Sequence, residues 1–368
     1  MKFIISQNEL NRAISLVSIA VTSRSTMNIM KGILAEVKDG RLILTGTDNY
    51  VRIEKTLDLI EYEEGATVLP AKLFGDIIRK LPDDIVTVQS DERGQASIST
   101  SMSHFNIVCF SAEEYPEAEV VEETGRLRIN KETFMQMVKK TAFAASKDDS
   151  RGVLVGILIR STAERIDLVA LDGFRIAAAS ADTVMAGENE IIVAASILTE
   201  LVSILSDSGI DHEEIEFRFD SKKAEVASTD IRVTMSLLNG TFAKYEQLIP
   251  SEFAVRVHIS RSSLRESVER AALLALDGRN NLVKLHFEGD ELHISSRSES
   301  GKVDEVIPVQ KEGEDLEIGF NSKYLLEGLK AIDDENIIIN LNSGVTPCVI
   351  EPVSGSYTYL LLPVRIIS

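Results

Sequence analysis

The tripeptide Gly32-Ile33-Leu34 recurs 124 residues later as Gly156-Ile157-Leu158, and residues on both sides of it recur as well. The same offset relates three further pairs of residues: Ile5 to Ile129, Leu44 to Leu168, and Asp48 to Asp172. A single match arises easily by chance, whereas several matches in the same order at one offset indicate an internal repeat.

A third copy follows the second, with small changes of length in its loops. Two helix-like stretches and one strand-like stretch recur in all copies: Leu10 and Ile14 with Phe134 and Val138 and with Leu264 and Val268; Leu42 and Leu44 with Ile166 and Leu168 and with Leu292 and Ile294; residues 72–76 with 196–200 and 323–327. The shared order predicts that the chain is a triplication.

Each copy shows the same succession of periodicities. A short strand, at residues 2–6, 127–130 or 255–260, leads into an amphipathic helix, and alternating strands, a second helix and more strands follow. We expect the second helix of the first copy to run from Ala71 to Leu81, before Pro82. The residues expected to be buried on the second helices are Leu73, Phe74, Ile77, Ile78 and Leu81 in the first copy, and Ile197, Leu198, Leu201, Val202 and Leu205 in the second.

Two segments separate the copies. Residues 113–125 are acidic and contain Pro116, and residues 248–253 contain Pro250. We therefore expect three α+β domains at 1–118, 126–248 and 254–368. Each should have two helices backed by antiparallel sheets.

Composition excludes several classes of protein. The chain has 368 residues, of which 44% are hydrophobic and only 5% aromatic, so its cores should be mainly aliphatic. No apolar run is long enough to span a bilayer, and the start of the chain turns polar too early for a signal peptide. We expect a cytoplasmic protein in which Cys109 and Cys348 are buried thiols.

The net charge of −19 argues against a uniformly basic surface for nucleic acid. Three of the predicted helical regions are nevertheless net positive, around residues 71–81, 131–147 and 260–279, whereas the helix at 196–207 has Glu200 and Asp207 and no basic residue. Basic residues on a helix are often merely solvated. Their recurrence favours a lining that meets phosphates without reading bases.

Repeats that carry helices on one side curve when placed end to end, and they leave unpaired strand edges at the two ends of the series. The first copy ends in the β-prone stretch His104–Cys109, and the third carries Leu273-Leu274 after a helix. Pairing of such ends would close two chains head to tail. The alternative is that these residues simply fill local cores.

Several stretches together resemble the bacterial beta sliding clamp, the beta subunit of DNA polymerase III. They are Met1-Lys2-Phe3, Leu44-Thr45-Gly46-Thr47-Asp48, Leu171-Asp172-Gly173-Phe174-Arg175-Ile176 and Tyr359-Leu360-Leu361-Leu362-Pro363-Val364-Arg365-Ile366. The resemblance covers the whole chain. It implies a DNA clamp fold and a homodimeric ring around double-stranded DNA, without sequence preference. It also implies a clamp loader that opens the ring, and polymerase and repair proteins that dock through short linear motifs.

The resemblance places a peptide-binding pocket between the second and third domains. Carried over residue by residue, the pocket comprises Leu154, Leu171, Gly173, Phe174, Arg175, Ile176, Leu248, Val345, Thr346, Pro347, Leu360, Leu361, Leu362, Pro363, Val364 and Arg365. An aliphatic groove of this kind suits Leu or Phe anchors. Leu171 stands where the family usually has Thr, and Phe174 where it often has His or Tyr. Ala243 and Gln247 stand where some members have Pro and Arg.

The resemblance and the charged helices also predict where DNA and a second copy bind. The DNA-contacting candidates are Arg24, Lys72, Arg79, Lys80, Lys139, Lys140, Lys147 and Arg151. The dimer-interface candidates are Phe105 and Ile107, facing Leu273 and Leu274. We expect weak contact with DNA, because Asp148 falls where some members have Gln.

Two other functions remain to be weighed. An enzyme would need a partner for Asp172 as a base, and the chain has no nucleophile elbow, P-loop or dinucleotide fingerprint. Its five histidines lack metal-ligand spacing, so no cofactor or metal is implied. A scaffold built from repeats would share the fold and the groove but form no ring, and it would not be retained on circular DNA.

Overall fold

The computed structural model describes residues 1–22, 27–182, 187–207, 213–275 and 281–366. The chain divides into two compact units: residues 1–131 with 200–237, and residues 132–199 with 238–368. Each unit combines parts of two sequence repeats, because two of the sheets continue from one repeat into the next. Among the described residues, no helix has both the length and the apolar character needed to cross a bilayer.

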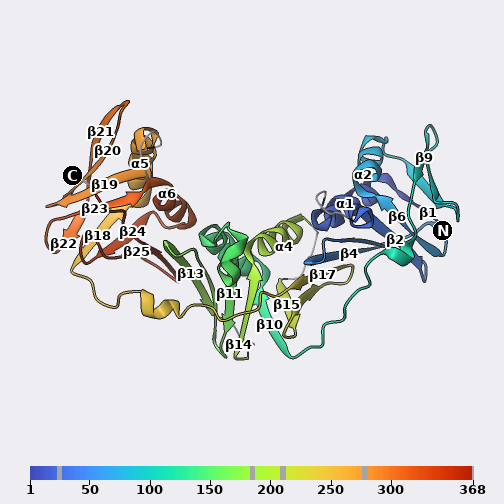
Figure 1. The fold of residues 1–368 in the computed structure, drawn as a ribbon, viewed down its shortest axis with the longest axis horizontal. Coiled ribbons are helices and arrows are strands. Elements are labelled where there is room, and N and C mark those ends of the chain that lie inside the picture. The colour runs from blue at the N-terminus through green and yellow to red at the C-terminus, as the bar shows by residue number, and fades with distance from the viewer. Residues whose placement is uncertain (23–26, 183–186, 208–212, 276–280, 367–368) are drawn as a thin grey trace. The chain divides into compact units, whose positions relative to one another are not determined.

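The first repeat matches the prediction closely. Its helices are α1 (Gln7–Val17) and α2 (Ala71–Lys80), and its strands are β1 (Lys2–Ser6), β2 (Gly32–Lys38), β3 (Arg41–Thr47), β4 (Val51–Asp58), β5 (Glu61–Glu63), β6 (Gly65–Pro70), β7 (Ile85–Ser90), β8 (Gln95–Ser99) and β9 (His104–Val108). Helices α1 and α2 lie side by side (Figure 1). Phe74 and Ile78 are buried as predicted, but Leu73 is 48% exposed, because it is one residue away from the buried face of α2.

The second repeat has one helix shorter than predicted. Its helices are α3 (Lys131–Thr141) and α4 (Ala195–Asp207), and its strands are β10 (Gly125–Asn130), β11 (Gly156–Ser161), β12 (Arg165–Leu171), β13 (Arg175–Asp182), β14 (Asn189–Ala194), β15 (Glu214–Phe219), β16 (Lys223–Ala227) and β17 (Ile231–Ser236). Lys147 therefore lies beyond α3. The Ser146 and Asp148 side chains accept hydrogen bonds from the backbone N–H groups of Asp148 and Ser150, which favours a turn over a helix. The five predicted core residues of α4 are all buried.

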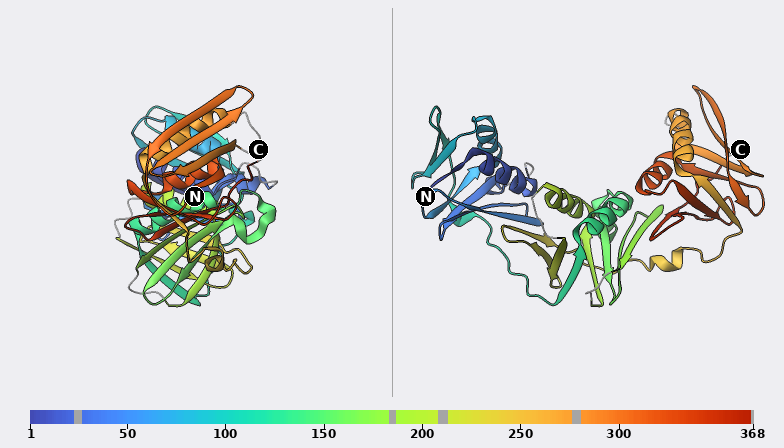
Figure 2. Two further views of the ribbon diagram at one scale, coloured as in Figure 1. Left: turned by 90° about the vertical axis from the view of Figure 1, so that its left-hand side faces the viewer. Right: turned by 180° about the vertical axis from the view of Figure 1, so that it is seen from behind.

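The third repeat places Leu273 and Leu274 inside a helix rather than after it. Its helices are α5 (Arg261–Ala275) and α6 (Ser322–Ala331), and its strands are β18 (Val255–Ser260), β19 (Leu282–Glu288), β20 (Glu291–Ser298), β21 (Gly301–Pro308), β22 (Gln310–Glu312), β23 (Leu316–Asn321), β24 (Asn336–Leu341), β25 (Cys348–Pro352) and β26 (Tyr357–Leu361). Helices α5 and α6 pack together, and Figure 2 shows this pair from behind.

The sheets join the repeats in a regular way. Each repeat contributes two four-stranded sets, and β5 and β22 are short additions at sheet edges. In one unit β4 of the first repeat pairs with β17 of the second, and in the other unit β13 of the second pairs with β26 of the third. All strand pairs in the described chain are antiparallel. The fold is therefore α+β, with three repeats linked through shared sheets.

Close packing explains the glycine of the repeated tripeptide. A Cβ atom on Gly32 would lie 2.3 Å from Cγ1 of Val68, and one on Gly156 would lie 2.7 Å from Cγ2 of Ile192. Val68 and Ile192 occupy equivalent positions on β6 and β14, which pair with β2 and β11. Any side chain at these two positions would push the paired strands apart.

Candidate functional site

The turn between β12 and β13 holds the centre of the predicted pocket. The Asp172 carboxylate accepts hydrogen bonds from the backbone N–H groups of Phe174 and Arg175, and Gly173 has φ +88°, a conformation that favours glycine. Phe174 is thereby left 54% exposed, stacked on the ring of Tyr324 at a centroid distance of 6.2 Å. The turn is rigid, and it presents an aromatic side chain to solvent.

Asp48 forms the same turn in the first repeat. Its carboxylate accepts from the backbone N–H groups of Tyr50 and Val51, and Asn49 has φ +76°. The repeated aspartate of the sequence is therefore a turn residue in both places. This structural role accounts for Asp172 without any catalytic function.

Arg175 is a buried anchor. Its side chain is 4% exposed and is paired with Asp172, at 3.0 Å between Nε and Oδ2, and with Glu327. Nη2 donates to the backbone oxygen of Phe143 at 2.7 Å, and the guanidinium lies 4.3 Å from the ring centroid of Tyr324. Burial alone would lower the pKa of Arg175, but the hydrogen bond to Glu327 and the surrounding negative charges raise it above its ordinary value. Arg175 thus stays charged and holds the β12–β13 turn against α6.

An apolar cluster lies on the other face of β13. Ile176 follows Arg175 and so points to the opposite face of the strand. It packs in one cluster with Leu171 and Leu360, against which Leu154 also packs. The cluster further contains the following residues: Leu158, Val169, Ile192, Phe242, Tyr245 and Val349. The predicted pocket residues are therefore divided between two faces of one sheet.

The remaining pocket candidates are mostly exposed. Leu248 ends the short 3₁₀ helix Tyr245–Leu248, whose Tyr245 belongs to the apolar cluster. Phe174, Leu248, Val345 and Leu362 are exposed apolar side chains, whereas Thr346, Pro347, Pro363 and Val364 are half-buried and Arg365 is exposed. The backbone N–H of Leu362 donates to the Phe174 oxygen at 2.9 Å, and that of Val364 to the Gly319 oxygen at 2.8 Å. The C-terminal segment is thus fixed beside the β12–β13 turn.

A cavity of about 350 Å³ opens beside this turn. It is lined by Ala145, Ser146, Lys147, Asp148, Arg151, Asp172, Phe174, Arg175, Lys323, Tyr324 and Glu327. Lys147 and Arg151, predicted to contact DNA, therefore share a cavity with the pocket candidates Phe174 and Arg175. Arg151 approaches the turn so closely that a Cβ atom on Gly173 would lie 3.0 Å from its Nη2.

The other DNA candidates lie on helix surfaces. Lys72, Arg79 and Lys80 are exposed on α2, and Arg79 is paired with Asp76. Lys139 is exposed at the end of α3, whereas Lys140 is half-buried and paired with Asp333 at 2.8 Å. Arg24 lies outside the described residues. The candidates thus differ in how much of their positive charge is already paired with a carboxylate of the same chain.

The interface candidates lie on two elements. Phe105 is 39% exposed on β9, which forms one edge of its five-stranded sheet, whereas Ile107 is only 7% exposed and belongs to the core beneath that strand. Leu273 is 70% exposed in the last turn of α5, and Leu274 packs beside the start of β21. Of the two strand residues, Phe105 has the larger free surface.

Comparison with known proteins assigns the chain to a family. The models for the N-terminal, central and C-terminal domains of the DNA polymerase III beta subunit match residues 1–119, 128–244 and 246–365. A beta sliding clamp of Synechococcus elongatus is 32% identical over 375 residues, covering 100% of both chains. The chain belongs to the beta sliding clamp family. The function of the family is that of a sliding clamp in DNA replication.

Solved sliding clamps share the whole fold. The Thermotoga maritima beta subunit has a TM-score of 0.93 at 30% identity, and the Bacillus subtilis clamp 0.95 at 28%, each covering 100% of both chains. The Pseudomonas aeruginosa clamp, solved with griselimycin bound, has a TM-score of 0.94 at 25% identity, again covering 100% of both chains.

Sequence reasoning missed three residues of this sliding clamp that complete the site. Tyr324 stacks on Phe174, Glu327 pairs with Arg175, and Phe143 accepts a hydrogen bond from Arg175. Tyr324 and Glu327 belong to the repeated stretch at 323–327, so the repeat located their helix but gave no sign of their contacts. Phe143 lies in the segment mistaken for a continuation of α3.

Proposed function

We propose that two copies of this chain close head to tail into a ring around duplex DNA and act as the processivity factor of replication. The observation that carries the proposal is the repeated strand pairing between repeats. β4 pairs with β17 and β13 with β26, always the same strand of one repeat with the last strand of the next. Each such pairing is called a junction below.

Two strands of the series lack this partner within the described chain. β21 holds in the third repeat the place of β4 and β13, and it forms the edge of its four-stranded sheet. β9 holds in the first repeat the place of β17 and β26, and it is also an edge. A third and a fourth junction, between β9 of each copy and β21 of the other, use both edges and close the series. A heterologous contact that closes in this way gives a ring instead of a filament.

Side chains beside these edges support the same pairing. Leu274 of α5 lies next to Gly301, the first residue of β21, and Leu273 beside it is exposed. Phe105 is the exposed apolar residue of β9 on the core side of its sheet, opposite Ile98 of β8. Across the proposed junction Phe105 covers Leu273 and Leu274, with Ile107 supporting Phe105 from the core.

DNA contact is assigned to the basic residues on and near the helices. The proposed residues are Arg24, Lys72, Arg79, Lys80, Lys139, Lys140, Lys147 and Arg151. Such side chains meet phosphates and carry no sequence information. Because the chain has a net charge of −19, this contact is weak, and the closed ring provides the retention.

Polymerase and repair proteins are proposed to bind through short peptides at the β12–β13 turn. Phe174, Leu248, Val345 and Leu362 offer exposed apolar area, and the buried cluster around Leu171 supports the β12–β13 turn from the other face of β13. Arg175 holds the turn in place. The griselimycin-bound P. aeruginosa clamp supports a ligand site in this family.

The proposal includes four further points. The chain is not an enzyme, the ring is opened by a clamp loader, the protein works in the cytoplasm, and its domains span residues 1–118, 126–248 and 254–368. The aspartate that an enzyme would use as a base is engaged in turn formation, which supports the first point.

Retention on circular DNA tests the ring. Purified clamp is loaded onto nicked plasmid by a bacterial clamp loader, and the plasmid is then linearised. We expect retention on the circle and loss after linearisation, with a dimeric mass by sedimentation. A monomer that is lost equally from both DNA forms would favour a scaffold of repeats.

Peptide binding is tested separately by fluorescence anisotropy. Deleting residues 362–368 keeps the Arg175–Leu361 strand pair but removes exposed Leu362 and the backbone hydrogen bonds that Leu362 and Val364 donate to Phe174 and Gly319, so we expect a folded dimer with weakened peptide affinity. Val120→Ala is the matched control, because it removes an exposed apolar side chain from a different unit, outside the strands proposed to form the junctions. Unchanged affinity in the deletion variant would remove the C-terminal segment from the pocket.

A further inference from the structure

The two junctions within the chain share one register. Ile53 of β4 pairs with Val233 of β17, and Ala177 of β13 pairs with Tyr359 of β26. Ala177 lies at the repeat offset of 124 from Ile53. A shift of one residue would turn every side chain to the other face of the sheet, so a shared register is a strong constraint on any further junction.

Rows of paired residues carry this register onto the two free edges. In each repeat, one row of paired residues runs from the first strand to the last strand of a four-stranded set. The equivalent rows in the three repeats are Phe3–Val88–Ile98–Phe105, Leu127–Phe217–Val226–Val233 and Val257–Ile339–Ile350–Tyr359. In the other four-stranded set, one equivalent pair of residues joins β3 to β4, β12 to β13 and β20 to β21. These pairs are Leu44–Lys55, Leu168–Ala179 and Ile294–Glu305. Phe105 is therefore the equivalent of Val233 and Tyr359. Val303, two residues before Glu305, is the equivalent of Ile53 and Ala177, which lie two residues before Lys55 and Ala179. The register sets Phe105 opposite Val303.

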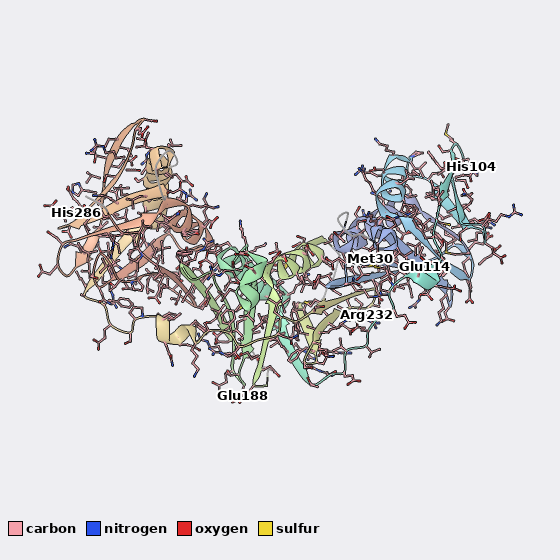
Figure 3. The ribbon with its side chains drawn as sticks, viewed as in Figure 1. Met30, His104, Glu114, Glu188, Arg232 and His286 are labelled. Atoms are coloured by element: carbon pink, nitrogen blue, oxygen red, sulfur yellow. The ribbon has the colours of Figure 1, made fainter. Side chains whose placement is uncertain are left out.

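We propose that His104 of one copy lies directly opposite Asp304 of a second copy, and that ring closure strengthens when His104 is protonated. This inference rests on the proposed ring. The next pair along the register is His104 with Asp304. In the first junction the equivalent pair is Arg232 with Glu54. Arg232 and Glu54 form an ion pair in the first junction, with Nη1 and Oε2 3.7 Å apart. Figure 3 labels Arg232 and His104 on their strands.

The surroundings of Asp304 already resemble those of Glu54. Arg52 pairs with Glu54 along β4 at 2.8 Å, and Lys302 pairs with Asp304 along β21 at 2.7 Å. Each carboxylate thus has a basic neighbour two residues earlier on its own strand. What Asp304 lacks within the described chain is the cross-strand cation that Arg232 supplies to Glu54.

The other groups facing this position are few and mostly neutral. On β8, Ser99 lies opposite His104, and on β20, Ser295 lies opposite Asp304. The charged and titratable groups on the two sides are Lys302 and Arg297, which pair across β21 and β20; His293 of β20, whose Nε2 lies 3.5 Å from Oε2 of Glu291; and Asp84, whose carboxylate accepts from Ser101 in the turn before β9. The helix side of the sheet contributes Glu305, but it points to the opposite face and pairs with Arg270.

The sign of the pH dependence follows from the histidine. Histidine gains its charge between about pH 8 and pH 5, and only the charged ring forms an ion pair with a carboxylate. An imidazole that binds its proton more tightly in the ring than in the free chain stabilises the ring at low pH. This stabilisation is lost as the pH rises and the imidazole loses its proton. An exposed ion pair shifts an equilibrium by up to about five-fold, and the ring has two such pairs. We therefore expect the dimer dissociation constant to be roughly two- to thirty-fold lower at pH 6 than at pH 8.

Dilution experiments on the full chain test the inference. Dimer dissociation constants are measured by mass photometry at pH 6 and pH 8 for the wild type, H104Q, H104R, D304N and the control H258Q, which alters a histidine on β18, in a sheet that contains neither β9 nor β21. We expect H104Q and D304N to lose the pH response. H104R should stay tight at both pH values, and H258Q should respond like the wild type.

The possible outcomes separate the inference from the ring itself. A dimer whose pH response survives in H104Q, or that shows no pH response at all, overturns the His104–Asp304 pair and leaves the ring in place. A wild-type chain that stays monomeric at micromolar concentration at both pH values overturns the proposed ring, and the inference with it.

Discussion

Arg175→Ala should destabilise the structure around the β12–β13 turn, and any loss of peptide binding should follow from that destabilisation. The substitution removes the cation that neutralises Asp172 and Glu327, together with a hydrogen bond to the Phe143 backbone oxygen. Breaking a buried ion pair by removing one partner costs about 3–5 kcal/mol. Glu327 keeps 29% of its side chain exposed, so we expect a loss near the lower end, about 3 kcal/mol.

The expected loss is large enough to measure by melting. For a cooperative unit of this size, 1 kcal/mol corresponds to roughly 2–4 °C in Tm, so Arg175→Ala should lower the Tm of the transition that melts β13 by about 6–12 °C. Circular dichroism and peptide anisotropy are recorded on the same sample. Peptide affinity should fall together with the Tm, because the β12–β13 turn loses its anchor.

Arg165→Ala is the matched control. Arg165 lies on the neighbouring strand β12 and pairs with Asp167, but its side chain is 59% exposed. Exposed ion pairs contribute about 0–1 kcal/mol, so this variant should melt within a few degrees of the wild type. The reasoning is refuted if Arg175→Ala keeps the wild-type Tm and dimer while peptide binding is abolished, because Arg175 would then act on the peptide directly.

Three further predictions concern the ring, DNA and acid stability. Leu273→Ala should weaken the dimer, because truncating a buried leucine costs about 2–5 kcal/mol; sedimentation that still gives a dimer at nanomolar concentration would exclude Leu273 from the interface. Lys139→Ala should reduce the slope of log K against log salt for short duplex DNA by roughly 0.9 for each phosphate that is no longer neutralised. Lys140→Ala should reduce this slope less, because Lys140 is paired with Asp333. Equal reductions by the two variants would contradict this prediction. The Arg270 hydrogen bond lowers the pKa of Glu305 from its ordinary value of 4.5, so stability from this pair is present above that pH and is lost as the pH falls through the folded-state pKa. The difference in urea midpoint between wild type and Arg270→Gln should accordingly vanish in strong acid, and a difference that persists there would contradict the pairing.

Local order was predictable because it depends on neighbouring residues. The strand at residues 2–6, the strand at 255–260 and the buried face of α4 follow from periodicity, which needs only the residues of the element itself. The failures have local causes as well. The helix predicted to reach Lys147 ends at Thr141, and around Lys147 the side chains of Ser146 and Asp148 bind nearby backbone groups, a competition that helical periodicity does not register.

The site was predictable only in part, because its contacts join distant segments. The sequence located the β12–β13 turn and the C-terminal strand, yet the pairing of Arg175 with Glu327 spans 152 residues. Consecutive residues such as Arg175 and Ile176 look like one motif in the sequence, but a strand sends them to opposite faces. A list of matched positions therefore combines a charged anchor on one face of β13 with a buried apolar cluster on the other.

The two junctions within the chain and the two free edges differ in their side chains and in their exposure. At the second junction, Ala177 and Ala179 of β13 are paired with Tyr359 and Tyr357 of β26, and both tyrosines are buried. At the first, Arg52, Glu54 and Arg232 form a surface charge network. At the free edges every residue of β21 keeps some exposure, and four of the five residues of β9 are exposed. β9 and β21 are edges of their sheets in the single chain, and their exposed apolar side chains, Phe105 and Val108 on β9 and Val306 on β21, are the area that a neighbouring strand would cover.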